Sequence, residues 1–241
     1  MIAVTLDTET SGITPEDQVV EVGIIVRDLS SSNSASPVMW SSLVKPTVPV
    51  HPAARANHHI LDAELAGAPS MTDIMGSLHT YFAVADIVAG HNLAFDLKML
   101  LQSGVPDNIL PSAKVCTWIC ARHLWPDAPG YANQTLRYWR GIDIPPSATH
   151  RALSDATVTD ALLQNMLKEA TPEKLIELTA TPVLQTKVMF GKHRDKLWSD
   201  VDANYCRWIL DRNRQPPFND EVRFAAAHWL KIHEAKKEQK K

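Results

Sequence analysis

The stretch Val4-Thr5-Leu6-Asp7-Thr8-Glu9-Thr10-Ser11-Gly12 places two carboxylates directly after an apolar segment. Residues 2–6 are apolar and partly β-branched, which predicts a short buried strand. Residues i and i+2 of a strand face the same side, so we expect Asp7 and Glu9 to point together. Two like charges beside a core require a partner, and hard divalent cations are the usual partner for carboxylate oxygens. The alternative is a strand end whose acids are solvated by water.

Length and composition are those of one ordinary domain with an appendage. The chain has 241 residues, and 45% of them are hydrophobic, which is enough for a sizeable core. No apolar run is long enough to span a bilayer and no signal-peptide pattern opens the chain, so we expect no membrane association. Three cysteines argue against a disulfide framework and for a reducing, cytoplasmic compartment.

Charge is distributed unevenly along the chain. Residues 1–180 contain 11 basic and 19 acidic side chains, a net charge of −8, whereas residues 181–241 contain 13 and 8, a net charge of +5. An acidic body attracts metal ions and a basic tail attracts a polyanion. A lysine-rich C-terminus that promotes solubility would give the same distribution. Since the sequence pattern also changes near residue 181, we expect a domain over residues 1–180 and a small module over residues 181–241.

Hydrophobic periodicity predicts strands first and alternating helices later, which favours a mixed α/β sheet with helices on its faces. The expected strands cover residues 2–6, 18–27, 38–44, 86–90 and 114–117. The expected helices of the domain include residues 53–66, 70–82, 93–104, 133–140 and 151–170. The module is expected to contain a strand and turn over residues 187–192, an aromatic segment over residues 205–210 and a final helix over residues 220–236.

Asp96, His150 and Asp155 also carry groups suited to catalysis. Asn92 ends the fourth expected strand and is placed to cap the following helix, and Asp96 lies one turn into that helix among apolar neighbours. His150 and Asp155 are five residues apart at the start of another helix. If that helix begins just after His150, the histidine lies on a loop, where it can swing to accept a proton. The alternative for His150 is a helix cap or a surface residue.

Together these positions resemble the DEDDh exonuclease superfamily, a branch of the ribonuclease H-like fold. Its first motif, D-x-E, corresponds to Asp7 and Glu9. Its second motif, H-N-x2-F-D, corresponds to residues 91–96, and its third, H-x4-D, to His150 and Asp155. All three occur in the family's order. The resemblance implies a ribonuclease H-like mixed five-stranded sheet flanked by helices, with a small α+β C-terminal module.

Four further segments are similar to the exodeoxyribonuclease X branch of this superfamily, so the resemblance covers nearly the whole chain. They are residues 115–117, 121–126, 190–194 and 205–208. One departure is Asp195, where that branch usually has glycine. Glycine adopts a left-handed turn more readily than aspartate, so the sequence favours this turn less than the usual sequence of that branch does.

The resemblance implies a metal-dependent 3′–5′ exonuclease that hydrolyses DNA from its 3′ end to nucleoside 5′-monophosphates, in DNA repair or end processing. Asp7, Glu9, Asp96 and Asp155 would hold two Mg²⁺ or Mn²⁺ ions, and His150 would take the proton from the attacking water. An RNA-trimming exoribonuclease, a polymerase proofreading subunit and a non-catalytic binding protein are the alternatives. Retention of all five residues argues against the last.

The resemblance also implies a nucleic-acid partner, either single-stranded or duplex DNA 3′ ends or RNA, and a repair or polymerase protein as a second partner. The sequence leaves the oligomeric state open. The side chains expected to contact the terminal nucleotide are Thr8, Thr10, Ser11, Ile13 and His58. His91 and Asn92 are expected mainly to fix the loop of the second motif, and substrate contact is their second expected role. Ile13 is equally well a core residue. Lys192 and Arg194 are expected to follow the phosphate backbone, while Tyr205 and Trp208 either stack on bases or form a small core, which we favour.

Overall fold

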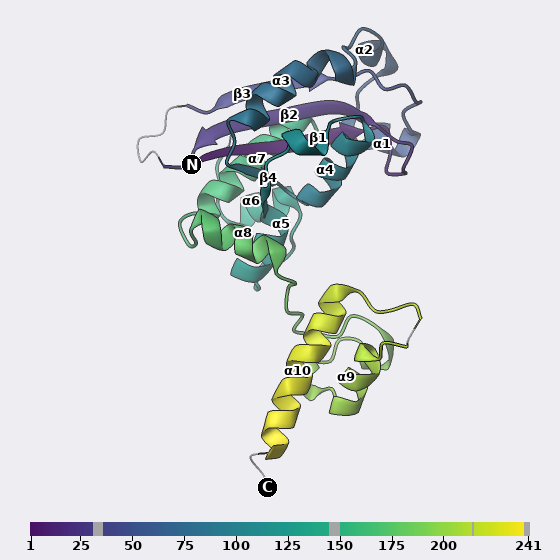
Figure 1. The fold of residues 1–241 in the computed structure, drawn as a ribbon, viewed down its shortest axis with the longest axis vertical. Helices are drawn as coiled ribbons and strands as arrows, with labels where there is room; N and C mark the ends of the chain where they lie inside the picture. The colour runs from purple at the N-terminus through teal and green to yellow at the C-terminus, as the bar shows by residue number, and fades with distance from the viewer. Residues whose placement is uncertain (31–35, 145–149, 214, 239–241) are drawn as a thin grey trace. The chain divides into compact units, whose positions relative to one another are not determined.

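Residues 1–30, 36–144, 150–213 and 215–238 are described by a computed structural model of the chain (Figure 1). The chain separates into two units, Met1–Thr179 and Ala180–Lys241. The first unit contains the whole sheet, and the second has its own hydrophobic core.

The sheet is mixed, with the strand order β3-β2-β1-β4-β5. β1 (Ile2–Thr10), β2 (Val19–Asp28) and β3 (Val38–Leu43) form an antiparallel meander. β4 (Ile87–Gly90) pairs in parallel with both β1 and β5 (Ala113–Cys116). The predicted mixed five-stranded sheet is confirmed. β1 is longer than its apolar residues predicted, because its pairing with β2 continues through Glu9.

Helices cover the sheet on both faces (Figure 1). In chain order they are α1 (Pro52–His58), α2 (Asp62–Ala66), α3 (Met71–Ala83), α4 (Leu93–Gln102), α5 (Thr117–Leu124), α6 (Asn133–Trp139), α7 (Ala152–Met166) and α8 (Pro172–Ala180). The pattern over residues 53–66 forms two helices because His59 adopts a left-handed conformation, with φ 58°, and ends α1. Within the described residues, no helix combines the length and apolarity needed to cross a membrane.

Successive side chains of β1 enter different cores. Val4 and Leu6 pack in a core with residues of α3 and α4, whereas Ala3 packs in a second core with residues of α5, α6, α7 and α8. Side chains alternate along a strand, so Asp7 and Glu9 lie on the side of α7 with Ala3. The same alternation puts Thr8 on the side of α4. The sheet therefore offers carboxylates of β1 to one helix layer and a hydroxyl of β1 to the other.

α7 packs against the backbone of β2 at Gly23. A Cβ atom at this position would lie 2.3 Å from the backbone nitrogen of Leu153 and 2.4 Å from the carbonyl carbon of Ala152. Gly23 is also the β2 residue that pairs with Asp7 of β1. The missing side chain thus allows the first turn of α7 to lie directly beside the D-x-E strand.

Two ion pairs fix α7 along β2 on either side of this contact. Arg27 binds Asp160 with an Nη2–Oδ2 distance of 2.6 Å, and Arg151 binds Glu21 with an Nη2–Oε1 distance of 2.7 Å. The Ala152 backbone N–H also donates to Glu21 at 3.0 Å. Glu21 therefore satisfies a free N–H at the helix start, where the helix dipole favours a negative charge.

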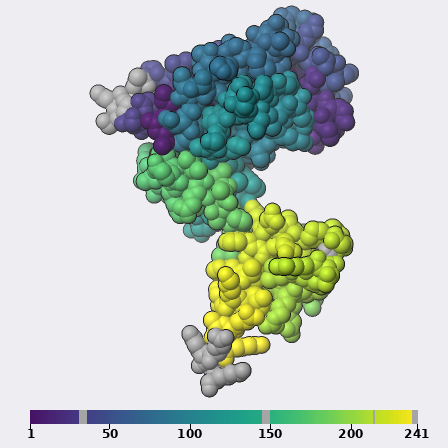
Figure 2. Space-filling model, in the orientation of Figure 1, coloured from purple at the N-terminus to yellow at the C-terminus, as the bar shows by residue number. Residues whose placement is uncertain are grey.

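The second unit contains α9 (Ala203–Leu210) and α10 (Asp220–Glu238). Side chains fill the space between these two helices (Figure 2), and Trp198, Cys206 and Ile209 are fully buried among them. The chain before α9 forms one antiparallel bridge, between Lys187 and Leu197.

Asp195 forms the left-handed turn of this bridged segment. Its φ is 68°, and its backbone N–H donates to the carbonyl oxygen of Val188 at 2.8 Å. Aspartate is among the non-glycine residues that tolerate this conformation. The turn therefore forms although the chain has no glycine at this position.

Replacing Gly23 by alanine is expected to destabilise the first unit, because the added methyl group meets helix backbone rather than a movable side chain. Such overpacking costs about 1–3 kcal/mol. Gly76→Ala is the matched control, since a Cβ atom there meets nothing within 4 Å and alanine is favoured over glycine in a helix by about 1 kcal/mol. Urea unfolding of both variants measures the change. An unchanged free energy of unfolding for Gly23→Ala would show that α7 shifts at no cost.

Candidate active site

Three carboxylates lie together where β1 approaches the first turn of α7. Oxygen atoms of Asp7, Glu9 and Asp155 all lie within 4.8 Å of one another. β1 contributes two of them from one face, and α7 contributes the third. The structure thus brings together three of the four carboxylates that the sequence selected as metal ligands.

Asp96, the fourth carboxylate, is in the first turn of α4 and is 3% exposed. The backbone N–H and the hydroxyl of Thr8 both donate to its Oδ1, at 3.0 and 2.8 Å. The charge of Asp96 raises the pKa of Asp7, so the two carboxylates are near neighbours although Asp96 lies outside the group of three. Thr8 thus orients Asp96 toward the other carboxylates, and its substrate contact stays a prediction.

Asn92 begins α4 in a left-handed conformation, with φ 67° and ψ 41°. The prediction that its side chain caps the helix is wrong, because the side chain makes no capping hydrogen bond. Asparagine is instead one of the few residues that readily adopt this conformation. The turn at Asn92 leads the chain from β4 into α4, which places Asp96 in its first turn.

His91 is held by hydrogen bonds to two other segments. Its Nδ1 lies 2.9 Å from the hydroxyl of Thr117, and its Nε2 lies 2.7 Å from the carbonyl oxygen of Tyr131. A carbonyl oxygen only accepts, so Nε2 carries the proton. Burial lowers the pKa of His91, which keeps the ring neutral. His91 therefore fixes the loop after β4, and its contact with substrate stays a prediction.

His150 lies two residues before α7, with its side chain exposed and a φ of 58°. Its backbone N–H donates to Oδ2 of Asp155 at 3.1 Å, and Gln134 of α6 donates to Oδ1 at 3.3 Å. Both oxygens of Asp155 are therefore oriented by hydrogen bonds. Sequence reasoning missed Gln134, a polar residue on a short helix that no motif singles out.

Sequence reasoning also missed Glu21, which the structure makes the partner of Arg151. Its signal was an acid inside the otherwise apolar run of residues 19–26. Glu21 pairs with Glu9 across the two strands and raises its pKa. The ion pair with Arg151 thus supports the start of α7 and limits the negative charge that Glu21 adds to the site.

Burial and mutual repulsion make these carboxylates hard to ionise. Burial, followed by the charges of Asp96, Asp155 and Glu9, raises the pKa of Asp7 well above its usual value. Burial and the neighbouring Asp155 raise the pKa of Glu9 to about 8. Burial also raises the pKa of Asp96 to about 7, against the opposing effect of the two hydrogen bonds from Thr8.

A divalent cation would remove this repulsion. The donor set consists of carboxylate oxygens, which are the ligands that hard cations such as Mg²⁺ and Mn²⁺ prefer. Arg151 lowers the pKa of Glu9 somewhat, but its guanidinium is bound to Glu21. Asp7, Glu9 and Asp155 therefore fit a divalent metal ion both in the spacing of their oxygens and in their need for positive charge.

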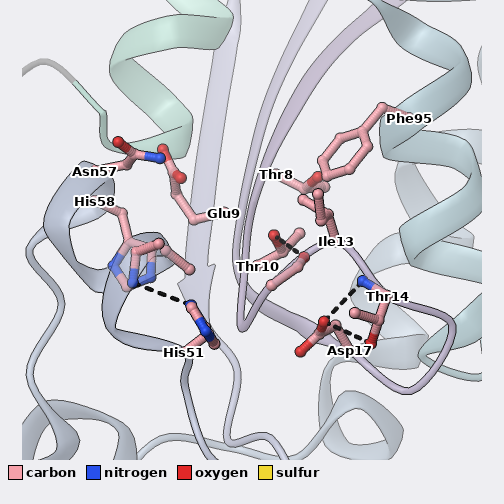
Figure 3. A pocket seen from close by; sticks show the side chains of 13 residues that line it. Thr8, Glu9, Thr10, Ile13, Thr14, Asp17, His51, Asn57, His58 and Phe95 are labelled. Carbon is pink, nitrogen blue, oxygen red and sulfur yellow. Dashed lines mark hydrogen bonds between the residues drawn. The ribbon is translucent and has the colours of Figure 1, made fainter.

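A pocket of about 470 Å³ opens beside Glu9 (Figure 3). Glu9, Asn57 and His58 lie on one side of it, and Ile13 and Phe95 lie on the other. Ile13 is 76% exposed, which is incompatible with a core residue. The pocket thus presents apolar side chains opposite Glu9, one of the three carboxylates whose spacing fits a metal ion.

Polar side chains that were expected to bind substrate are engaged in shaping this pocket. The hydroxyl of Thr10 donates to the carbonyl oxygen of Gly12 at 2.8 Å, and that of Ser11 donates to Asp17 at 2.8 Å. His58 is 2% exposed, and its Nδ1 accepts a hydrogen bond from a backbone N–H at 3.0 Å. These three side chains fix the pocket wall, and their contacts with substrate stay predictions. Lys192 and Arg194 are exposed in the other unit.

Comparison with known proteins gives a consistent result. An exonuclease family matches residues 4–163 of the chain. Exodeoxyribonuclease 10 of Escherichia coli strain K12 is 32% identical over 93% of this chain and 97% of its own length. A DNA polymerase III subunit epsilon-like protein of Rhodobacter capsulatus is 32% identical over 65% of this chain but only 22% of its own length.

Among solved structures, Exonuclease X in complex with 5′ overhanging duplex DNA is 31% identical. The match covers 73% of this chain and 99% of the Exonuclease X chain, with a TM-score of 0.59.

The metal-free protein is expected to lose stability as pH rises from about 5 to about 8. The pKa of Glu9 is about 8 in the folded chain and about 4.3 when unperturbed, so between these values the folded state holds a proton that the unfolded chain releases. Asp7→Asn removes one repelling charge. In EDTA at pH 8 it should unfold about 4–8 °C higher than the unmodified protein, equivalent to about 2 kcal/mol.

Asp127→Asn is the matched control for this measurement, because Asp127 is exposed and lies outside the acidic group. It should unfold at the same temperature as the unmodified protein, both at about pH 5 and at about pH 8. Mg²⁺ should raise the unfolding temperature of the unmodified protein at pH 8 and that of Asp7→Asn much less. Equal stability of Asp7→Asn and the unmodified protein in EDTA at pH 8 would contradict the predicted repulsion.

Proposed function

The chain belongs to the exonuclease family and is a 3′–5′ exonuclease hydrolase, and from that premise we propose that it removes nucleoside 5′-monophosphates from the 3′ ends of DNA. The observation that carries this proposal is the convergence of Asp7, Glu9 and Asp155, with Asp96 buried beside them. The name of the Escherichia coli relative and the DNA in the Exonuclease X structure support DNA as the substrate. We assign the activity to DNA repair or end processing.

The four carboxylates would together hold two Mg²⁺ or Mn²⁺ ions, which would activate water for attack and neutralise charge on the scissile phosphate. The family's motif pattern makes Asp7 the ligand that both ions would share, and its position on β1 directly before Thr8, which binds Asp96, is consistent with that role. Glu9 and Asp155 would bind on the side of α7, and Asp96 on the side of α4. Thr8 and Gln134 keep Asp96 and Asp155 in place through their hydrogen bonds.

His150 would accept the proton of the attacking water. It lies on the loop before α7, where its exposed ring can rotate, and its backbone N–H is bound to Asp155. The imidazole is thus tethered to the acidic site through its own main chain. A neutral imidazole accepts the proton and passes it to solvent as the ring swings outward.

The pocket beside Glu9 would hold the terminal nucleotide. Its volume of about 470 Å³ is within the range of small-molecule sites. Ile13 and Phe95 offer apolar surface to a base, and the loop fixed by Thr10 and Ser11 forms the wall next to it. A nucleotide in this pocket would place its phosphate toward Glu9 and the other carboxylates.

Digestion of matched 5′-labelled single-stranded DNA, duplex DNA and RNA tests the reaction and the substrate. In Mg²⁺, DNA should shorten stepwise from the 3′ end with release of 5′-monophosphates, and EDTA should stop the reaction. Asp7→Ala should abolish turnover, because it removes the shared ligand. Residual turnover within tenfold of the unmodified enzyme would rule out that role for Asp7, and faster digestion of RNA than of DNA would overturn the substrate assignment.

His150→Ala is expected to lower turnover by about 10²–10⁴, the usual effect of losing a general base. His79→Ala is the matched control, since His79 is an exposed histidine of α3 outside the pocket. Single-turnover hydrolysis of a short DNA strand in saturating Mg²⁺ measures the chemical step for both variants. A His150→Ala enzyme that cleaves within threefold of the unmodified rate would mean that another group accepts the proton.

A further inference from the structure

Five aromatic rings form a continuous row in the second unit. The ring centres of Phe190 and Phe218 are 4.9 Å apart, and those of Phe218 and Trp208 are 5.5 Å apart. Trp208 and Tyr205 are stacked at 5.1 Å, and Tyr205 meets His193 at 4.4 Å. The row joins the segment before α9, α9 itself and the segment before α10.

Four of these rings line a pocket of about 570 Å³, a volume typical of small-molecule sites. The lining residues are Phe190, Gly191, Lys192, Asp202, Asn204, Tyr205, Trp208 and Phe218. Tyr205 is buried, as expected of a core residue, but Trp208 is 44% exposed. The core of this unit is instead built on the fully buried Trp198. Trp208 therefore presents an indole surface to the pocket, and the prediction that it belongs to a small core is wrong.

Positive charge is concentrated in the segment that contributes Phe190, Gly191 and Lys192 to this pocket. Residues 187–196 carry four exposed basic side chains, Lys187, Lys192, Arg194 and Lys196, and a single acid, Asp195. Within the described part of the chain, none of the four basic groups forms an ion pair. The Nζ atom of Lys192 lies 5.7 Å from the centre of the Tyr205 ring, at the pocket itself.

The acid that lines the pocket has a structural use. Asp202 accepts hydrogen bonds from the backbone N–H groups of Asn204 and Tyr205, at 2.9 and 3.0 Å, at the start of α9. Its carboxylate still repels an anion from that side. A ligand with both a planar apolar ring and a negative charge would therefore place the charge at Lys192 and the ring over Trp208.

We propose that this aromatic pocket binds single-stranded DNA, with one base stacked on Trp208 and an adjacent phosphate at Lys192. Nucleotides supply both required groups, and stacking on aromatic side chains accepts any base. The inference rests on the proposed function for its choice of DNA over other polyanions. The pocket would hold the strand by its interior nucleotides, whereas the acidic site acts on the 3′ end.

A circular single-stranded DNA tests this site, because it has no 3′ end to enter the catalytic pocket. Its affinity for the full chain in EDTA is measured by fluorescence anisotropy over a range of salt concentrations. Trp208→Ala should weaken binding about tenfold, within the range for loss of one stacked base. Trp208→Phe keeps an aromatic face and should bind within about threefold of the unmodified protein. Lys192→Gln should lower the slope of log affinity against log salt by about 1.

Phe224→Ala is the matched control, because Phe224 is an exposed aromatic residue of α10 that does not line the pocket. It should bind the circle with unchanged affinity. Thermal unfolding checks that each variant stays folded, and if Trp208→Ala does not fold, the salt slope of Lys192→Gln decides. Unchanged affinity for Trp208→Ala, or an unchanged slope for Lys192→Gln, would overturn the proposal. Hydrolysis of linear DNA by the unmodified protein is scored separately, so failure of the proposed function is distinguishable from failure of this site.

Discussion

Repulsion among four carboxylates is the constraint on which the rest of the first unit depends. Burial raises the pKa of each of the four carboxylates. The pKa of Asp7 is raised further by the negative charges of Asp96, Asp155 and Glu9. Such a cluster opposes folding whenever it is ionised without a metal ion. The fold must therefore hold the carboxylates together by contacts made elsewhere. Its two hydrophobic cores, one on each face of the sheet, provide most of that stability.

The position of α7 shows how the fold does this. Asp155 reaches the site only because α7 lies against β2, a strand that contributes no predicted metal ligand. Gly23 allows the close approach, and ion pairs from Glu21 and Arg27 fix the helix on either side of it. Arg27–Asp160 is the more buried of the two pairs, and losing one partner of a buried ion pair typically costs about 3–5 kcal/mol, because the other charge is left unpaired. β2 is therefore as important to the geometry of the site as the strand that carries Asp7 and Glu9.

What the sequence could predict follows from the range of the interactions involved. The common orientation of Asp7 and Glu9 follows from the two-residue period of a strand, and the place of Asp155 follows from a helix start just before it. The hydrogen bond from Gln134 to Asp155 and the ion pair of Glu21 with Arg151 could not be predicted in this way. Gln134 is separated from Asp155 by 21 residues, and Glu21 is separated from Arg151 by 130, so only the folded chain brings them together. The prediction that the Asn92 side chain caps α4 is wrong, because the left-handed backbone of Asn92, rather than its side chain, makes the turn.

The charge asymmetry of the chain gains a physical meaning from these two sites. The first unit carries −8, and Asp7, Glu9 and Asp155 lie together at the site proposed to meet a phosphate, so without metal ions this site would repel the proposed substrate. Divalent cations reverse the sign of that field only over a short range, since exposed charges are screened within about 8 Å at physiological salt. Binding of the rest of a DNA strand would therefore need positive charge away from the metal site. The second unit carries +5 and the exposed indole ring of Trp208. If the two proposals hold, an acidic catalytic unit and a basic binding unit divide two tasks that conflict in one site, because strong metal binding and strong phosphate binding demand opposite charges.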